Sequence, residues 1–206
     1  MSSLILDLPY NFHWVVPDEA ARSAQAYAGF LGPFLQAHGI RTLINLRGSN
    51  PRHLWWRYET RACARAGVLH CDARFNSRQL PAGAMLLDLL NTFDMAPRPL
   101  LIKCSGGQDR TSFAAAIYLL HVHGWQAMPH AARQFARWPY LHFPNRQQRW
   151  LRLFPVFAAE QAGAGPLRNW IGGAYSAEAF RIWLEQRGEG ASFHGLYGVP
   201  GNAPKR

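Results

Sequence analysis

The stretch PLLIKCSGGQDRTSFAAAIYLLHVHG, residues 99–124, joins a short apolar segment to a longer one through a loop with two glycines. Pro99 to Lys103 has the length and composition of a buried strand. The segment from about Arg110 to His123 is largely apolar, which predicts a buried helix, and Gly124 suits the left-handed position that ends a helix. We therefore expect a strand, a loop and a central helix in succession.

Two more short apolar segments, Arg41–Leu46 and Val68–Asp72, predict strands, and helical patterns follow them at His53–Ala66 and Pro81–Met95. Strands that alternate with helices predict an α/β fold, in which a central, mostly parallel sheet is flanked by helices. The segment Asn11–Ser23 is expected to add a hairpin at the edge of this sheet.

The remainder of the chain is expected to be helical. Helices are predicted at Pro129–Arg137 and Asn145–Glu160, and residues 162–166 have the composition of a linker. We therefore predict a main domain at residues 1–160 and a helical C-terminal extension at residues 161–206 that docks on it.

The length of 206 residues fits one compact domain, and a composition of 49% hydrophobic residues can form a sizeable core. The formal net charge is +10, and all but two of the 22 basic residues are arginines. Arginine binds phosphate bidentately, so this balance favours phosphate-bearing or otherwise acidic partners. The alternative is a general preference for arginine, because these arginines are scattered along the chain.

Several classes of protein fit the sequence poorly. No apolar stretch approaches the ~20 residues of a membrane span. The N-terminus lacks a basic segment, and Asp7 interrupts the apolar run Leu4 to Leu8, so we expect no secretory signal and a cytoplasmic location. Three cysteines are an odd number, which argues against a disulfide framework, and the spacing of Cys and His residues is not typical of a zinc site.

The loop between Cys104 and Arg110 has the residues that bind an anion. A short loop that curls into a helix N-terminus points its N–H groups inward, and glycines permit the close approach. The same field lowers the pKa of a cysteine and makes its sulfur nucleophilic. Arg110 is placed to hold two phosphoryl oxygens. The predicted phosphate-binding residues are Ser105, Gly106, Gly107, Gln108, Asp109 and Arg110.

The pattern Cys104-x5-Arg110-Thr111 resembles the signature of cysteine-dependent protein tyrosine and dual-specificity phosphatases, above all the small bacterial members. The likeness extends over about residues 10 to 155. It implies that Cys104 forms a phosphocysteine, that Arg110 binds the phosphoryl oxygens, and that Thr111 donates a hydrogen bond to the sulfur. It also implies that no metal or other cofactor is needed. Lys103 departs from the family, most members of which have His before the cysteine.

Two aspartates are candidates for the general acid that protonates the leaving oxygen. Asp72 ends a predicted strand, and its separation from Cys104 is similar to that of the acid loop in dual-specificity phosphatases. Asp109 lies in the loop itself, as in some bacterial and lipid-directed members, although it could instead form a structural ion pair with a neighbouring Arg. We give Asp72 a slight preference.

Positions at the carboxyl ends of parallel strands are expected to converge on the site, because ligands of open sheets bind there. Arg47, Asp72 and Cys104 occupy such positions. Arg47 is therefore a candidate for contact with phosphate or substrate, and an ordinary solvated loop arginine is an equal alternative. Arg22, Arg74 and Arg78 are weaker candidates of the same kind.

The function favoured by these residues is hydrolysis of phosphomonoesters. The expected substrate is a phosphorylated protein, dephosphorylated either at tyrosine or with dual specificity. Hydrolysis of phosphoinositides or inositol phosphates is an alternative, which Asp109 and the positive net charge of the chain favour. Against it, the loop interior from Ser105 to Gln108 has no Lys or Arg to bind additional phosphates. A second alternative is a non-catalytic module that binds phosphate or nucleic acid. Since the set Cys104, Arg110 and Thr111 exceeds what binding requires, we expect a phosphorylated protein, small molecule or lipid as the partner and no stable nucleic-acid complex.

Cys63 and Cys71 are expected to be core thiols, because free cysteine is often buried. A more specific hypothesis is that Cys71 forms a reversible disulfide with Cys104 after oxidation, since thiols of low pKa oxidise readily.

Overall fold

The computed structural model describes residues 7–26 and 29–197, and these contain a five-stranded sheet with the strand order β1-β2-β5-β3-β4. Strands β2, β5, β3 and β4 are parallel, and β1 runs antiparallel to β2. The predicted α/β fold with a mostly parallel sheet is confirmed. The strands are β1 (His13–Val16), β2 (Ala20–Ser23), β3 (Thr42–Asn45), β4 (Leu69–Asp72) and β5 (Leu100–Lys103).

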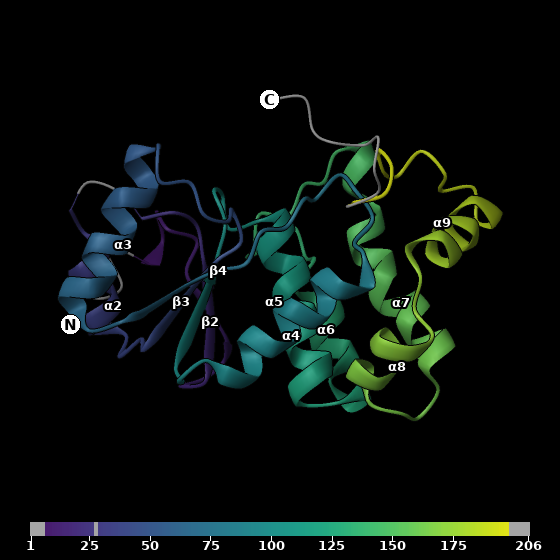
Figure 1. Cartoon of the computed structure of the whole chain (residues 1–206), viewed down its shortest axis with the longest axis horizontal. Coiled ribbons are helices and arrows are strands. Elements are labelled where there is room, and N and C mark those ends of the chain that lie inside the picture. Colours follow the sequence, from purple (N-terminus) through teal and green to yellow (C-terminus); the bar gives the residue numbers. More distant parts are fainter. Residues whose placement is uncertain (1–6, 27–28, 198–206) are drawn as a thin grey trace.

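The sheet separates two layers of helices, because alternate side chains of each strand point to opposite faces. Leu43 and Leu101 pack against α2 and α3, whereas Ile44 and Ile102 face the larger group that includes α4, α5 and α7. Figure 1 shows α2 and α3 on one side of the sheet and the other helices on the far side. The α-helices are α2 (Leu31–Ala37), α3 (Leu54–Ala66), α4 (Gly83–Met95), α5 (Asp109–Val122), α6 (Met128–Arg133), α7 (Trp150–Ala162), α8 (Leu167–Gly173) and α9 (Ala177–Gln186).

Helix α5 is the centre of the fold. Every residue from Thr111 to Leu120 is buried, as expected for a helix that is apolar all round. Phe113 contacts the rings of Phe75, Trp150 and Phe154, so the helix that follows the loop is held by two other segments, the chain after β4 and helix α7. The position of the loop is therefore fixed by the core.

The N-terminal hairpin differs from its expected place in one respect. Strand β1 is at the edge of the sheet, but β2 lies inside it, between β1 and β5. The small side chains of Ala20 and Ala21 are fully buried there. A four-residue strand without β-branched or aromatic residues gives a weak strand signal, which explains why the sequence did not predict an internal position.

Some predicted helices are shorter than expected. The helix predicted at Pro129–Arg137 ends at Arg133, and the segment predicted as a helix from Asn145 to Glu160 begins with a 3-10 turn at Arg146–Gln148 before α7. Helix α2 was not predicted, and α8 lies in the C-terminal extension that was predicted to be helical, but no separate helix was predicted there. Both have seven residues, which is short for a periodic pattern to be recognised.

The C-terminal helices pack on α7 through aromatic rings. Phe154 and Phe157 of α7 lie 5.4 Å and 4.8 Å from Phe180 of α9, measured between ring centroids, and Phe157 lies 5.4 Å from Trp183. The hydroxyl of Ser176 accepts a hydrogen bond from the backbone N–H of Ala179 and caps α9. The predicted division into a main domain and a C-terminal extension at residue 160 stays a prediction. The last residues of the extension, 198–206, lie outside the described part of the chain. No helix of the described residues is both long and apolar enough to cross a membrane.

Candidate active site

The loop from Cys104 to Gln108 joins the end of β5 to the start of α5 at the carboxyl edge of the sheet. Gly107 has a φ of +65°, and a Cβ atom there would lie 2.5 Å from the backbone nitrogen of Ala24. Only glycine permits this approach of the loop to the end of β2. The backbone N–H of Gln25 also donates to the carbonyl of Ser105, so β2 and the residues after it hold the loop in place.

Arg22 supports the loop from behind. Its side chain is fully buried and donates to the carbonyl of Gly107 and to the hydroxyl of Ser112, at 2.8 Å and 2.9 Å, and also to Gln134. Burial lowers the pKa of Arg22 to about 10, and the positive charge persists at neutral pH. This arginine therefore fixes the loop and adds positive charge near Cys104 without facing the pocket.

The sulfur of Cys104 is almost completely buried, with 4% of the residue exposed. Burial alone would raise the pKa of this thiol, but the charge of Arg110 and hydrogen bonds from Thr111 and Gln108 lower it below its ordinary value. The buried hydroxyl oxygen of Thr111 has no other hydrogen-bond partner within the described ranges, so its proton is available to the sulfur. These contacts favour the thiolate over the protonated thiol.

Cys104 and Arg110 line one pocket of about 370 Å³. The Arg110 guanidinium donates to the hydroxyl of Ser105 at 3.0 Å and reaches the carbonyl of Leu46 at 3.4 Å, so it lies along the pocket wall. The pocket brings together five of the six predicted phosphate-binding loop residues and several residues that sequence analysis did not select. Its lining residues are Asn76, Ser77, Arg78, Cys104, Ser105, Gly106, Gln108, Asp109, Arg110 and Gln148.

Asp109 lies in this pocket, and a partner distant in sequence fixes its carboxylate. The side-chain amide of Gln148 donates to Oδ2 of Asp109 and also contacts the hydroxyl of Ser77, both at 2.9 Å. Nε2 of His142 lies 3.5 Å from Oδ1 of Asp109. The Nδ1 atom of His142 is bonded to the carbonyl of Phe135 and must be the donor, since a carbonyl only accepts.

His142 is therefore in a form that can face a protonated carboxyl group. Burial lowers the pKa of His142, although the charge of Asp109 opposes this shift, and the ring is neutral at pH 7. Its Nε2 then presents a lone pair to Asp109. A proton on Oδ1 of Asp109 would find an acceptor there.

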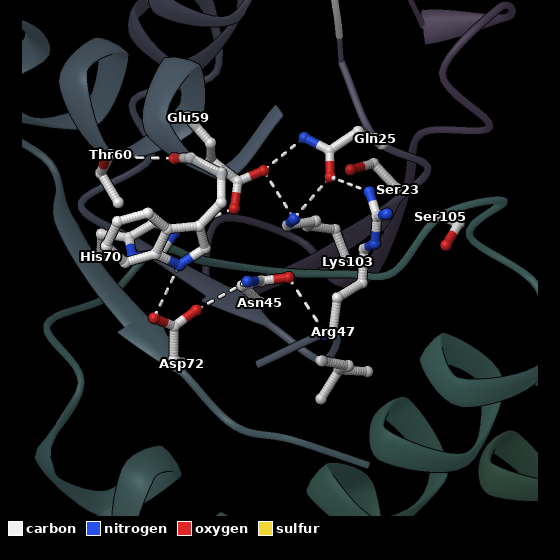
Figure 2. Close-up of polar contacts among 12 residues, drawn as sticks. Ser23, Gln25, Asn45, Arg47, Glu59, Thr60, His70, Asp72, Lys103 and Ser105 are labelled. Carbon is white, nitrogen blue, oxygen red and sulfur yellow. Dashed lines mark hydrogen bonds and ion pairs between the residues drawn. The ribbon is translucent and has the colours of Figure 1, made fainter. Parts of the chain in front are cut away.

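Asp72 lies elsewhere. Its two oxygens accept hydrogen bonds from the side chains of Asn45 and Trp56, at 2.6 Å and 2.9 Å. It does not line the Cys104 pocket, and Figure 2 shows it on the opposite side of the polar cluster from Ser105. The geometry thus favours Asp109 over Asp72, the reverse of the order that the sequence suggested, because the side chain of Asp72 turns toward α3.

Comparison with known proteins agrees with the fold. Residues 9–163 match the family model described as PTP-SAK: Swiss Army Knife protein, DSP-PTPase phosphatase domain. The chain belongs to the PTP-SAK family. The predicted relation to the dual-specificity phosphatases is confirmed, and this PTP-SAK domain is a phosphatase domain. A comparison with curated proteins finds no match.

Solved structures similar to this PTP-SAK domain are distant in sequence and show the fold alone. One is a variant of P. aeruginosa TpbA in complex with pTyr, with 18% identity over 87% of this chain and 93% of that chain, and a TM-score of 0.53. Another is the core catalytic domain of the PP-IP phosphatase SIW14 from S. cerevisiae, with 16% identity over 87% and 93%, and a TM-score of 0.51. PTPMT1 in complex with PI(5)P has 17% identity over 74% and 99%, and a TM-score of 0.51.

A buried polar cluster lies under the loop of the PTP-SAK domain, around Lys103 (Figure 2). Its Nζ lies 2.5 Å from Oε2 of Glu59 and donates to the side chain of Gln25 at 2.7 Å, while Glu59 also binds His70. Burial lowers the pKa of Lys103 to about 8, against the charge of Glu59. Burial alone would raise the pKa of Glu59, but His70 and Lys103 hold it below its ordinary value, so both members of the pair are charged at neutral pH.

The other two cysteines of the PTP-SAK domain differ from Cys104. Burial raises the pKa of Cys63 to about 12 and also raises that of Cys71. Ile44 of β3 pairs with Cys71 of β4 on one side and with Ile102 of β5 on the other. Cys71 is therefore separated from β5 by two strand spacings, roughly 10 Å. A disulfide requires Cα atoms within ~7 Å of each other. The strand register therefore rules out the hypothesised Cys71–Cys104 disulfide unless the backbone moves.

Alkylation should distinguish the three thiols of the PTP-SAK domain. We expect iodoacetate to modify Cys104 with a rate that reaches half its maximum below pH ~8.5, the value of a free thiol, because a lowered pKa places the thiolate at lower pH. Cys63 and Cys71 should react only at higher pH. Mass spectrometry of the alkylated peptides across a pH series measures all three. A midpoint for Cys104 at or above that of Cys71 would contradict the electrostatic description of the loop.

Proposed function

We propose that this phosphatase domain hydrolyses phosphomonoesters through a phosphocysteine on Cys104. The thiolate attacks phosphorus, a bond forms between sulfur and phosphorus, and the bond between phosphorus and the leaving oxygen breaks. The leaving oxygen takes a proton from Asp109. Water then attacks the phosphocysteine and gives its proton to Asp109, and the products are inorganic phosphate and the regenerated thiolate.

One observation carries this proposal: Cys104, whose pKa is lowered, shares a pocket with a guanidinium that has free N–H groups beyond its contacts to Ser105 and Leu46. Arg110 would bind two phosphoryl oxygens and stabilise the charge of the transition state. The proton of Thr111 would stabilise sulfur as it leaves in the second step. The backbone N–H groups of Ser105 to Gln108 belong to the loop that would surround the phosphate.

The experiment that tests the proposal traps the intermediate. Purified protein is mixed with an aryl phosphate, release of the phenolate is followed, and the reaction is quenched in acid during turnover. The peptide with Cys104 should carry the mass of one phosphoryl group. A phosphoryl group on another residue, or a folded wild-type protein without hydrolysis of any aryl phosphate, would overturn the proposal.

The proposed acid gives a prediction about pH dependence. In Asp109→Asn we expect kcat to fall roughly 10²-fold, as is typical when a general acid is lost, and the decline of kcat at high pH to disappear. Asn cannot supply a proton, but it can still accept the hydrogen bond from Gln148, so the pocket should keep its shape. The pH profile of kcat for an aryl phosphate measures both effects.

Asp72→Asn is the matched control, because it also removes one carboxylate near the edge of the sheet. We expect a change of less than about threefold in kcat and an unaltered pH profile, since both oxygens of Asp72 are bonded to Asn45 and Trp56. If Asp72→Asn loses the decline at high pH and Asp109→Asn keeps it, the acid is Asp72.

A further inference from the structure

A second depression adjoins the Cys104 pocket. It has a volume of about 220 Å³ and shares Arg110, Asn76 and Ser77 with that pocket. Arg47 and Arg74 complete its charged lining. Arg47 was predicted to contact phosphate, but it does not line the Cys104 pocket, so its position needs a different explanation.

The net charge of the residues that line this depression is positive. Three of its lining residues are arginines, and none of those within the described ranges is acidic. Arg74 forms no ion pair with a described residue, and Asp72, two residues before it, is bonded to Asn45 and Trp56. Guanidinium groups in a concave, partly shielded place repel one another and attract an anion.

Contacts within the fold hold the side chain of Arg47, and a close approach of two turns positions the exposed Arg74. The Arg47 guanidinium lies 3.5 Å above the ring of Trp55 and donates to the side chain of Gln25 at 3.2 Å. Gly48, which has a φ of +73°, lets the segment after β4 come close: a Cβ atom at Gly48 would lie 2.7 Å from Cβ of Arg74. The turn after β3 therefore places Arg74 beside Arg47.

The C-terminal segment supplies another wall. The N–H of His194 donates to the carbonyl of Arg78 at 2.6 Å, and the N–H of Tyr197 donates to the carbonyl of Leu80 at 2.9 Å. Tyr197 thereby lines the depression. Residues far apart in the sequence thus build a defined hollow next to the nucleophile.

We propose that this hollow binds a second phosphoryl group of the substrate, and that the substrate is a compact polyol with phosphoryl groups on neighbouring carbons, such as an inositol bisphosphate or the headgroup of a phosphoinositide. This inference rests on the proposed function, because the first phosphoryl group would occupy the Cys104 pocket. Arg110 lines both hollows, so the two groups must lie on either side of one guanidinium. Neighbouring carbons of a ring place them that close.

A phosphopeptide fits this arrangement less well. Its nearest second anion is a carboxylate on another residue, which carries one negative charge, whereas a phosphate monoester carries about −1.5 to −2 at neutral pH. The loop interior from Ser105 to Gln108 has no basic side chain. Arg47 and Arg74 supply the extra positive charge from outside the loop instead.

The test compares kcat/KM for a vicinal inositol bisphosphate, an inositol monophosphate and an aryl phosphate. Wild-type protein should prefer the bisphosphate. Arg74→Gln should lower kcat/KM for the bisphosphate by roughly tenfold or more, as expected for a lost charged hydrogen bond, with a much smaller effect on the other two substrates. Arg57→Gln, which removes the same charge from the exposed side of α3, should leave the ratio of the rates unchanged.

Binding to the Cys104→Ser variant gives a second measurement that does not depend on catalysis. By calorimetry, Arg74→Gln in this background should weaken the bisphosphate and leave inorganic phosphate unaffected. Equal weakening of both, or no preference of the wild type for the bisphosphate, would overturn the second site. If no substrate is hydrolysed but the bisphosphate binds in an Arg74-dependent way, the proposed function fails and the second site stands.

Two more substrates identify the source of the ligand. A phosphotyrosine peptide with neighbouring acidic residues should show no dependence on Arg74. The same tenfold dependence for this peptide would overturn the polyol assignment. Vesicles that contain a vicinal phosphoinositide bisphosphate, compared with the free inositol bisphosphate, show whether the headgroup is accepted in a membrane or in solution, and hydrolysis of either supports the assignment.

Discussion

Cys104→Ser should lower kcat for an aryl phosphate by at least ~10⁴-fold, because loss of the nucleophile removes the covalent route. A serine hydroxyl keeps its proton where the thiol loses it. The contacts that stabilise the thiolate, from Arg110, Thr111 and Gln108, cannot ionise an alcohol at neutral pH. The remaining rate would come from binding and orientation alone.

The loop itself should survive this change, since it is held by groups other than the sulfur. Arg22 bonds to the carbonyl of Gly107, and Gln25 bonds to that of Ser105. We therefore expect Cys104→Ser to bind inorganic phosphate with an affinity within about tenfold of the wild type, by calorimetry.

Cys71→Ser is the matched control for the loss of a thiol. Cys71 lies on β4, outside the pocket, and its pKa is raised by burial and by Asp72, so kcat should stay within about twofold. Activity retained in Cys104→Ser, or lost equally in both variants, would show that the reaction does not use Cys104.

The parts of the site that could be predicted from sequence are those encoded in adjacent residues. The segment from β5 through the loop to α5 is continuous, so an apolar strand, two glycines and an apolar helix indicated its path and its anion-binding character. The lowered pKa of Cys104 agrees with that prediction because its causes, Arg110, Thr111 and Gln108, are also local.

The parts that could not be predicted depend on residues brought together by the fold. Gln148 bonds to Asp109 across 39 positions of sequence, and Lys103 contacts Glu59 on another element. Nothing in the spacing of these residues marks them as partners. The preference for Asp72 came from its position at a strand end, which determines where the backbone lies but not which way the side chain turns.

Lys103 illustrates how a departure from the family pattern is accommodated. An ammonium group at a fully buried position requires a counterion, and Glu59 supplies it from α3, together with Gln25. Gln25 also accepts a hydrogen bond from Arg47, and its backbone holds Ser105. One buried cluster therefore connects the residue before the nucleophile, the loop and the second arginine-lined hollow.

Arg110→Lys should separate the two roles of this arginine. The variant keeps a positive charge in the pocket, but a lysine cannot donate to two phosphoryl oxygens in the planar, bidentate way of a guanidinium. We expect kcat/KM for an aryl phosphate to fall by ~10²–10³-fold, the usual effect of losing one donor that stabilises the transition state. Arg57→Lys is the control, because Arg57 is exposed on α3 and outside the pocket.

The alkylation profile of Cys104 shows which role has been lost. Because Arg110→Lys retains the charge that lowers the pKa of Cys104, the pH midpoint for its reaction with iodoacetate should stay below that of a free thiol. Arg110→Ala removes the charge as well, so its midpoint should move to higher pH and its activity should fall at least as far. If Arg110→Lys hydrolyses aryl phosphate within tenfold of the wild type, a single positive charge is sufficient and bidentate binding is not part of the mechanism. If instead the midpoint of Arg110→Lys rises as far as that of Arg110→Ala, the guanidinium acts on the sulfur through its geometry and not through its charge.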